Sequence, residues 1–276
     1  MKFLDIRPLM NEFHIKPKKS LGQNFLVEPA GLRKVIEAAG VQKDDQVLEI
    51  GAGLGSLTVL LAQAARSVVA LEIDREIIPA LQKALEKYPN VQVVQGDILQ
   101  QNPEALALEA GYLVVANIPY YISSAILRHL LTAKQKPTRM ILTVQKEVAE
   151  RVCAREGKHS LLSLSVQVFG SPKLAGIIPA GSFLPAPEVD SAVLVIDLFL
   201  QPVIPEEDLD RFFALAKAGF SQKRKTLRNS LSGGMRISTQ EAETMLVNAG
   251  LDPMLRAEDL SLEAWGRLVQ TSKTLN

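Results

Sequence analysis

Three glycines at alternate positions, Gly51, Gly53 and Gly55, separate a short apolar strand predicted over Gln46–Ile50 from a helix predicted over Ser56–Ala64. Glycines in such a turn let the backbone approach a ligand closely at the amino end of a helix. The spacing G-x-G-x-G is tighter than the G-x-G-x-x-G fingerprint of dinucleotide-binding folds. The turn therefore predicts the strand, ligand loop and helix of an open α/β sheet.

Strands and helices alternate along most of the chain. Further strands are predicted over Ser67–Leu71, Val91–Gln95, Tyr112–Ala116, Arg139–Val144, Lys173–Ile178 and Ala192–Leu200. Helices are predicted over Pro29–Ala39, Arg75–Tyr88, Ser123–Leu131 and Lys146–Cys153, whereas the period of Leu161–Phe169 does not distinguish helix from strand. This alternation predicts an α/β fold with a doubly wound, mostly parallel sheet.

The last third of the chain has a different pattern. Pro202-Val203-Ile204-Pro205 is typical of a linker, and three amphipathic helices without strands follow it, over Asp208–Ala218, Gln240–Ala249 and Ser261–Thr271. We expect an α/β domain over residues 1–201 and a small helical domain over 202–276. Within the first domain, residues 14–27 form a basic, then polar, then aromatic segment that we expect to be an ordered flap.

Acidic residues follow two of the predicted strands. Glu72 comes about twenty residues after the glycines, where an acid can accept hydrogen bonds from both hydroxyls of a ribose. Asp97 follows the next strand and can accept from the amino group of an adenine. The G-x-G-x-G turn with its preceding Glu49 resembles the S-adenosylmethionine-binding motif. Alternatively, Glu72 and Asp97 are helix caps or loop carboxylates.

The fourth predicted strand ends in Asn117-Ile118-Pro119-Tyr120. An amide, a proline and an aromatic ring provide a hydrogen-bond acceptor, a stiff backbone and a stacking face where ligands of open α/β sheets bind. Taken alone, the tetrapeptide is also typical of a turn after a strand. In the proline-rich segment 183–191, Phe183 is either a second stacking face or a core residue.

Basic residues are clustered although the net charge is only +1. Lys16, Lys18 and Lys19 share one turn, and a second, acid-free cluster contains Lys217, Lys223, Arg224, Lys225 and Arg228. Such clusters are either solvated surfaces or surfaces that track phosphates.

Metal and thiol chemistry have little support in the sequence. The one cysteine, Cys153, cannot form an internal disulfide or a multi-cysteine zinc site, and the three histidines are scattered. We therefore expect no metal, and packing is the favoured role for Cys153. The apolar runs are too short to span a bilayer and the amino end lacks a signal-peptide core, which predicts a cytoplasmic protein.

Seven segments in order resemble the ribosomal RNA adenine dimethyltransferase family, and within it the bacterial small-subunit (16S) branch. They are Lys19-Ser20-Leu21-Gly22-Gln23-Asn24-Phe25-Leu26, residues 48–58, Gly96-Asp97, Asn117-Ile118-Pro119-Tyr120, Gln145-Lys146-Glu147-Val148-Ala149, residues 183–191 and residues 220–227. The resemblance implies a Rossmann-like class I methyltransferase domain that dimethylates the exocyclic amines of two adjacent adenosines near the 3′ end of small-subunit rRNA.

The resemblance also implies roles for particular residues. The cofactor S-adenosylmethionine would contact Gln23, Asn24, Leu26, Gly51, Gly53, Gly55, Glu72, Asp97 and Asn117. Asn117 and the Ile118 carbonyl would accept from the target amine, with Pro119 stiffening the motif, and Tyr120 and Phe183 would stack on the flipped base. RNA would contact Lys18, Lys19, Lys223, Arg224, Lys225 and Arg228.

The chain departs from the family pattern at two positions, because Ile118 often is leucine and Ala52 often is proline in the small-subunit branch. The expected partner is 16S rRNA within an immature small subunit, bound by a monomer. One alternative is an enzyme that methylates large-subunit rRNA. Another is a binding protein, either an assembly factor or a transcription factor that kept the fold.

Overall fold

The computed structural model describes residues 2–106 and 108–273 and divides into two compact units. One unit comprises Met1–Ala149 and Pro172–Leu198, and the other comprises Glu150–Ser171 and Phe199–Asn276. The second unit thus includes residues 150–171, whereas the sequence predicted a division near residue 202 alone.

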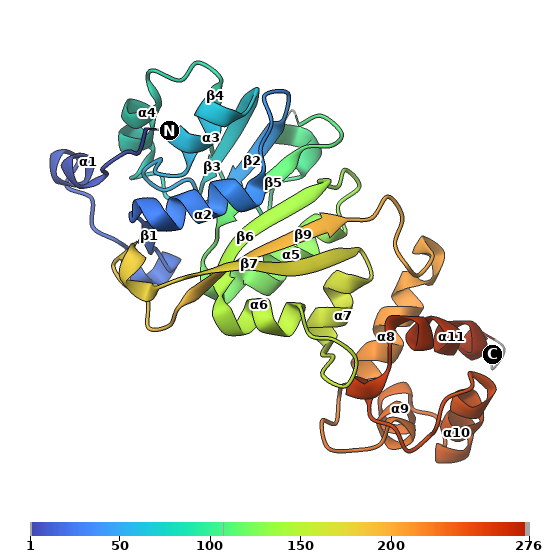
Figure 1. Cartoon of the computed structure of the whole chain (residues 1–276). Coiled ribbons are helices and arrows are strands. Elements are labelled where there is room, and N and C mark those ends of the chain that lie inside the picture. Colours follow the sequence, from blue (N-terminus) through green and yellow to red (C-terminus); the bar gives the residue numbers. More distant parts are fainter. Residues whose placement is uncertain (1, 107, 274–276) are drawn as a thin grey trace. The chain divides into compact units, whose positions relative to one another are not determined.

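The first unit is built on a seven-stranded sheet (Figure 1). Its order is β4 (Val91–Gln95), β3 (Ser67–Glu72), β2 (Gln46–Ile50), β5 (Leu113–Asn117), β6 (Arg139–Gln145), β9 (Ser191–Leu198) and β7 (Gly170–Ile178). The first five strands pair in parallel, and β9 pairs with β6 in the antiparallel sense. The predicted mostly parallel α/β sheet is confirmed.

Helices pack on both faces of this sheet, with α2 in front of it and α5 behind it in Figure 1. The helices of the first unit are α1 (Arg7–Glu12), α2 (Pro29–Ala39), α3 (Thr58–Ala64), α4 (Ile78–Leu85) and α5 (Ser123–Leu131). Alternate strand residues pack with α2 and α3 in one core cluster, as the period of a strand requires. Helix α1 was not predicted because it has only six residues and Leu9 is its one buried side chain.

The flap is tied to the proline-rich segment by a second, two-stranded sheet. In this sheet β1 (Phe25–Leu26) pairs antiparallel with β8 (Phe183–Leu184). Short 3-10 turns occur in both units: η1 (Lys19–Leu21), η2 (Pro103–Leu106), η3 (Tyr120–Ile122) and η4 (Ala180–Ser182) in the first, and η5 (Glu206–Asp208) and η6 (Ala257–Asp259) in the second.

The second unit is helical. The unit boundary falls within α6 (Lys146–Val152), and the unit contains α7 (Leu161–Gln167), α8 (Leu209–Gly219), α9 (Leu227–Met235), α10 (Thr239–Asn248) and α11 (Leu262–Ser272). The segment that the sequence left open is helix α7, which begins with a capping box between Ser160 and Ser163. No helix in the described parts of the chain is long and apolar enough to cross a membrane.

Helix α9 was not predicted, because it contains two consecutive glycines that lower helix propensity. The packing explains one of them. A Cβ atom on Gly234 would lie 2.5 Å from the Cβ of Ala218 on α8, so only glycine allows the two helices to approach this closely.

Candidate active site

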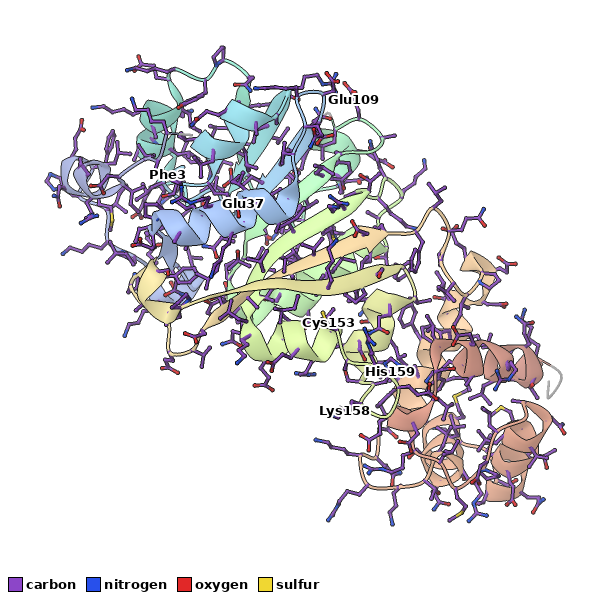
Figure 2. All side chains as sticks on the ribbon, in the orientation of Figure 1. Phe3, Glu37, Glu109, Cys153, Lys158 and His159 are labelled. Atoms are coloured by element: carbon purple, nitrogen blue, oxygen red, sulfur yellow. The ribbon has the colours of Figure 1, made fainter. Side chains whose placement is uncertain are left out.

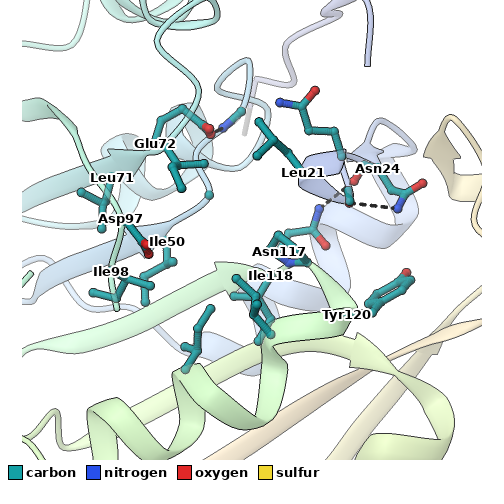
Figure 3. A pocket seen from close by; sticks show the side chains of 18 of the residues that line it. Leu21, Asn24, Ile50, Leu71, Glu72, Asp97, Ile98, Asn117, Ile118 and Tyr120 are labelled. Atoms are coloured by element: carbon teal, nitrogen blue, oxygen red, sulfur yellow. Dashed lines mark hydrogen bonds between the residues drawn. The ribbon is translucent and has the colours of Figure 1, made fainter. Parts of the chain in front are cut away.

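A pocket opens at the carboxyl ends of β2, β3 and β5, where the flap and the glycine turn meet (Figure 3). Most of the predicted site residues line it: Gln23, Asn24, Gly51, Gly53, Glu72, Asp97, Asn117, Ile118, Pro119 and Tyr120. Three predicted residues, Leu26, Gly55 and Phe183, do not line this pocket. One cavity therefore unites the flap, the glycine turn, two acidic strand ends and the Asn117 motif.

The glycine turn has a backbone that other residues rarely adopt. Gly51, Gly53 and Gly55 have φ angles of 75°, 56° and 89°. At Gly53 a Cβ atom would also lie 3.0 Å from the ring of Phe25, so glycine is needed on both grounds. Gly55 instead faces Leu81 of α4, where a Cβ would come within 3.2 Å. Glycine at position 55 therefore allows the turn to pack closely against α4.

Glu72 is held at the end of β3 by the backbone around it. One carboxylate oxygen accepts from the Gly53 N–H at 2.7 Å and the other from the Asp74 N–H at 2.9 Å. Its side chain is buried, and this burial raises the pKa of Glu72 above its ordinary value. Each oxygen keeps a lone pair that can accept from a ligand hydroxyl.

Glu49 is a functional candidate that the sequence analysis did not assign to the site. It is 1% exposed, and its Oε2 atom has no hydrogen-bond partner among the described residues. It lines a smaller cavity that shares Gly51, Gly53 and Asn117 with the main pocket. Burial raises the pKa of Glu49 to about 8, and the charge of Glu72 adds to the rise.

With this raised pKa Glu49 keeps its proton near neutral pH, and a ligand with a positive group would favour the ionised carboxylate. S-adenosylmethionine carries an ammonium group and a sulfonium, so the residues present fit this cofactor. The sequence signal for Glu49 is its place in the motif, directly before Ile50 and the glycine turn.

Asp97 lies near Ile50 and Ile98 in the pocket, away from Asn24 of the flap (Figure 3). Its carboxylate accepts from the Leu99 N–H at 3.0 Å and from the Gln100 side chain at 3.2 Å. Asp97 is thus also a loop carboxylate, the alternative that the sequence left open. Apolar side chains complete the walls around it, which suits a flat ring: Ile50, Leu71, Ile98, Ile118 and Ile126.

The Asn117 amide group is oriented by the flap. Its Nδ2 donates to the carbonyl oxygen of Asn24 at 3.0 Å, which leaves Oδ1 as an acceptor in the pocket. Ile118 is 2% exposed, so its side chain anchors the motif in the core. The Tyr120 hydroxyl lies 2.6 Å from Ser191 Oγ, and burial raises the pKa of Tyr120, which keeps the phenol neutral.

Phe183 differs from the expectation that its ring stacks on a base. The side chain is 4% exposed and packs in the core cluster with Leu26 and Leu32. The reason is the pairing of β8 with β1, where Phe183 lies opposite Leu26 and the two side chains enter the same core. Leu26 is likewise a core residue, and it lines only the smaller cavity.

Lys18 also differs from its predicted role. Its ammonium group lies 2.9 Å from Asp74 Oδ1 and 2.9 Å from Glu76 Oε2, so it is engaged within the protein. Gln23 Nε2 donates to the other oxygen of Asp74 at 2.8 Å. Burial raises the pKa of Asp74, but the bonds from Lys18 and Gln23 outweigh this and hold it below its ordinary value. The neighbouring Lys19 is exposed.

The basic segment of the helical unit, which the sequence predicts to contact RNA, is only partly exposed. Lys223, Arg224 and Lys225 are exposed. Arg228 instead pairs with Glu243 at 2.9 Å and is half-buried, so its guanidinium group supports the contact between α9 and α10. Arg228 is therefore a structural residue in this arrangement.

Cys153 follows α6 and His159 precedes α7 (Figure 2). Burial raises the pKa of Cys153 and lowers that of His159, which disfavours both the thiolate and the imidazolium of an activated pair. Across residues 2–106 and 108–273, no group of three or more His, Cys, Asp or Glu side chains is arranged to hold a metal ion.

Comparison with known proteins bears on the family to which this chain belongs. The sequence profile of a family described as ribosomal RNA adenine dimethylase matches residues 14–273. The ribosomal RNA small subunit methyltransferase A of Dehalococcoides mccartyi (strain CBDB1) is 43% identical over 263 residues, which cover 95% of this chain and 90% of that protein.

Two solved structures cover 90% of this chain at 27% identity. A dimethyladenosine transferase from Plasmodium falciparum superposes with a TM-score of 0.76 over 98% of its own length. The 23S rRNA methyltransferase ErmE superposes with a TM-score of 0.73 over 99% of its length.

Proposed function

This chain belongs to the ribosomal RNA adenine dimethylase family, and on that premise we propose that its pocket dimethylates two adjacent adenosines near the 3′ end of 16S rRNA. The protein is an rRNA adenine N6-dimethyltransferase of the Rossmann-like class I type that uses S-adenosylmethionine. The observation that carries the assignment of the site is the convergence of Glu72, Asp97 and the Asn117 motif on one cavity.

Different residues of the pocket would contact different parts of the cofactor. Glu72 would accept from the ribose hydroxyls with its remaining lone pairs, and Asp97 would accept from the adenine amino group. The turn around Gly51 and Gly53 would let the backbone lie against the ligand, and Glu49 would pair with a positive group of it. When bound, S-adenosylmethionine supplies a methyl group activated by the sulfonium.

The acceptor end of the pocket raises the reactivity of the target amine. An adenine amine is a poor nucleophile because its lone pair is delocalised into the ring. Asn117 Oδ1 and the Ile118 carbonyl accept its N–H groups, which favours a pyramidal nitrogen with its lone pair free. The Tyr120 ring stacks on the base, which offsets the cost of leaving the RNA stack by roughly 1–3 kcal/mol.

The small subunit is the favoured substrate because curated small-subunit enzymes are similar over nearly the whole chain, at 43% and 41% identity in two of them. The structurally similar large-subunit enzyme is only 27% identical. We further propose that the protein acts as a monomer in the cytoplasm on immature subunits, with Lys19, Lys223, Arg224 and Lys225 contacting rRNA phosphates.

Purified small and large ribosomal subunits that lack the modification test this function directly. Each is incubated with the protein and isotopically labelled S-adenosylmethionine, and the rRNA is digested and analysed by mass spectrometry. We expect dimethyladenosine in two adjacent positions of 16S rRNA and none in 23S rRNA. Label in 23S rRNA alone would assign the protein to the large-subunit enzymes, and the absence of label from both would refute the proposal.

A further inference from the structure

The flap is fastened to the end of β3 by a compact polar network. Lys18 bridges Asp74 and Glu76, and Gln23 donates to the oxygen of Asp74 that Lys18 does not use. The Gln23 side chain also accepts from the Lys18 N–H at 2.7 Å, which closes residues 18–23 into a ring. The Asp74 side chain is only 4% exposed, whereas those of Lys18 and Glu76 are 33% and 67% exposed, so the network is sheltered from water only at Asp74.

This network continues into the pocket through Glu72. The Asp74 N–H donates to one oxygen of Glu72, and the Gly53 N–H donates to the other. Displacement of Asp74 would therefore move a backbone donor that orients the Glu72 carboxylate. The contacts that hold the flap and the contacts that orient the cofactor-binding acid therefore meet in the three-residue segment from Glu72 to Asp74.

The other end of the flap rests on the Asn117 motif. Asn24 supplies the carbonyl that accepts from Asn117 Nδ2 (Figure 3). Gly22, with a φ of 61°, packs so closely that an added Cβ would lie 3.1 Å from the Tyr121 ring and 3.2 Å from Pro119. The flap thus spans the pocket from the end of β3 to the end of β5.

We infer that Lys18 is a positioning residue, which by pairing with Asp74 holds the flap closed over the cofactor and keeps the Asn117 amide oxygen directed at the target amine. This inference rests on the proposed function of the pocket. An Asn117 side chain without the Asn24 carbonyl is free to rotate, and its NH2 group would then compete with its oxygen for the acceptor position. Closing of the flap over the cofactor therefore also orients the Asn117 side chain for the substrate.

The alternative role for Lys18 is a contact with RNA phosphates. Two carboxylates already surround its ammonium group, and leaving them would expose the nearly buried Asp74 without its cation. Removing one partner of such a charge pair costs more than losing a surface contact. Lys19, in the same turn and exposed, provides the matched comparison.

The test compares Lys18→Met, Lys18→Arg and Lys19→Met with the unchanged protein. The probe is S-adenosylhomocysteine, whose dissociation rate is measured without RNA. Hydrogen exchange of the amides of residues 18–24 is followed by mass spectrometry in the presence and absence of this probe. Turnover on small subunits is then measured at saturating S-adenosylmethionine, so that kcat and the KM for RNA are separated.

We expect Lys18→Met to accelerate dissociation of the probe about tenfold, to speed exchange in residues 18–24 and to lower kcat, with the KM for RNA nearly unchanged. Lys18→Arg should restore most of the slow dissociation because it keeps the charge. Lys19→Met should leave dissociation and exchange unchanged, and should raise the KM for RNA.

Two results would overturn the inference. One is probe dissociation and exchange in Lys18→Met equal to those of the unchanged protein, and the other is a Lys18→Met defect confined to the KM for RNA. These outcomes are distinct from failure of the proposed function, which would appear as an unchanged protein that neither binds the probe nor methylates small subunits.

Discussion

The phenol oxygen of Tyr120 lies 2.6 Å from the hydroxyl oxygen of Ser191, which begins β9 on the far side of β6 in the sheet order. Ser191 is fully buried, so this hydrogen bond is sheltered from water. It joins the turn after β5 to a strand more than seventy residues later in the chain. The contact fixes the direction of the ring that we assign to stacking on the target base.

Removal of this contact should slow methyl transfer without removing the ring. Tyr120→Phe and Ser191→Ala should each lower kcat several-fold, since a loss of about 1 kcal/mol corresponds to roughly fivefold. Because both changes delete the same hydrogen bond, the double variant should be no slower than the worse single variant. Multiplicative effects in this cycle would show that the two residues act independently.

Replacement of Glu49 should change how stability depends on pH. The buried carboxyl has a pKa of about 8 in the folded state, against an ordinary value of 4.5, so it binds its proton more tightly when folded. Its contribution to stability is therefore fully present below pH 4.5 and is lost as the pH rises to about 8, at about 1.4 kcal/mol per pH unit.

Glu49→Gln should accordingly gain stability relative to the unchanged protein between pH 5 and pH 8, as measured by urea unfolding without cofactor. It should also weaken S-adenosylhomocysteine binding, because the positive group of the ligand loses its partner. A constant difference in stability across this pH range would contradict the burial argument.

A methyl group at Gly53 should block the pocket. Gly53→Ala combines a φ of 56° with a contact of 3.0 Å to Phe25, whereas Gly157→Ala meets a φ of 81° with nothing within 4 Å. Both variants should lose about 1 kcal/mol of stability from the backbone conformation. Only Gly53→Ala should also lose affinity for S-adenosylhomocysteine in isothermal titration, and equal affinities would show that Gly53 does not shape the site.

A change at Asp97 should alter the preference for the base of the cofactor. Aspartate accepts from the adenine amino group, while asparagine can also donate to a keto group. Asp97→Asn should bind S-adenosylhomocysteine about tenfold more weakly and should discriminate less against its inosine analogue. If the ratio of the two affinities does not change, Asp97 lies away from the base.

The sequence predicted the sheet and most of the pocket because both depend on local patterns. Apolar runs ending in Glu72, Asp97 and Asn117 place three polar groups at one edge of a parallel sheet, where they must converge. The residues whose surroundings differ from the prediction depend on contacts between segments that are far apart in the sequence. Lys18 looked like a surface charge because its partner Asp74 is 56 residues away.

Phe183 is a second residue whose surroundings could not be predicted from local sequence patterns. Its burial depends on the pairing of β8 with β1, which joins segments about 160 residues apart and has no periodic signal. Residues 150–171 likewise belong to the helical unit, although the rest of β7 and all of β9, which follow them in the chain, belong to the first unit. Glu49 was visible in its motif, but only the structure shows that one of its oxygens is buried without a partner.

Asn117→Ala provides the most direct test of the central claim that this amide activates the adenine amine. The variant removes Oδ1 from the pocket and the bond to Asn24, so S-adenosylhomocysteine binding should weaken only moderately, by about tenfold or less. Methyl transfer to 16S rRNA in small subunits, measured by mass spectrometry at saturating S-adenosylmethionine, should fall at least a hundredfold. Turnover near that of the unchanged protein would contradict the account.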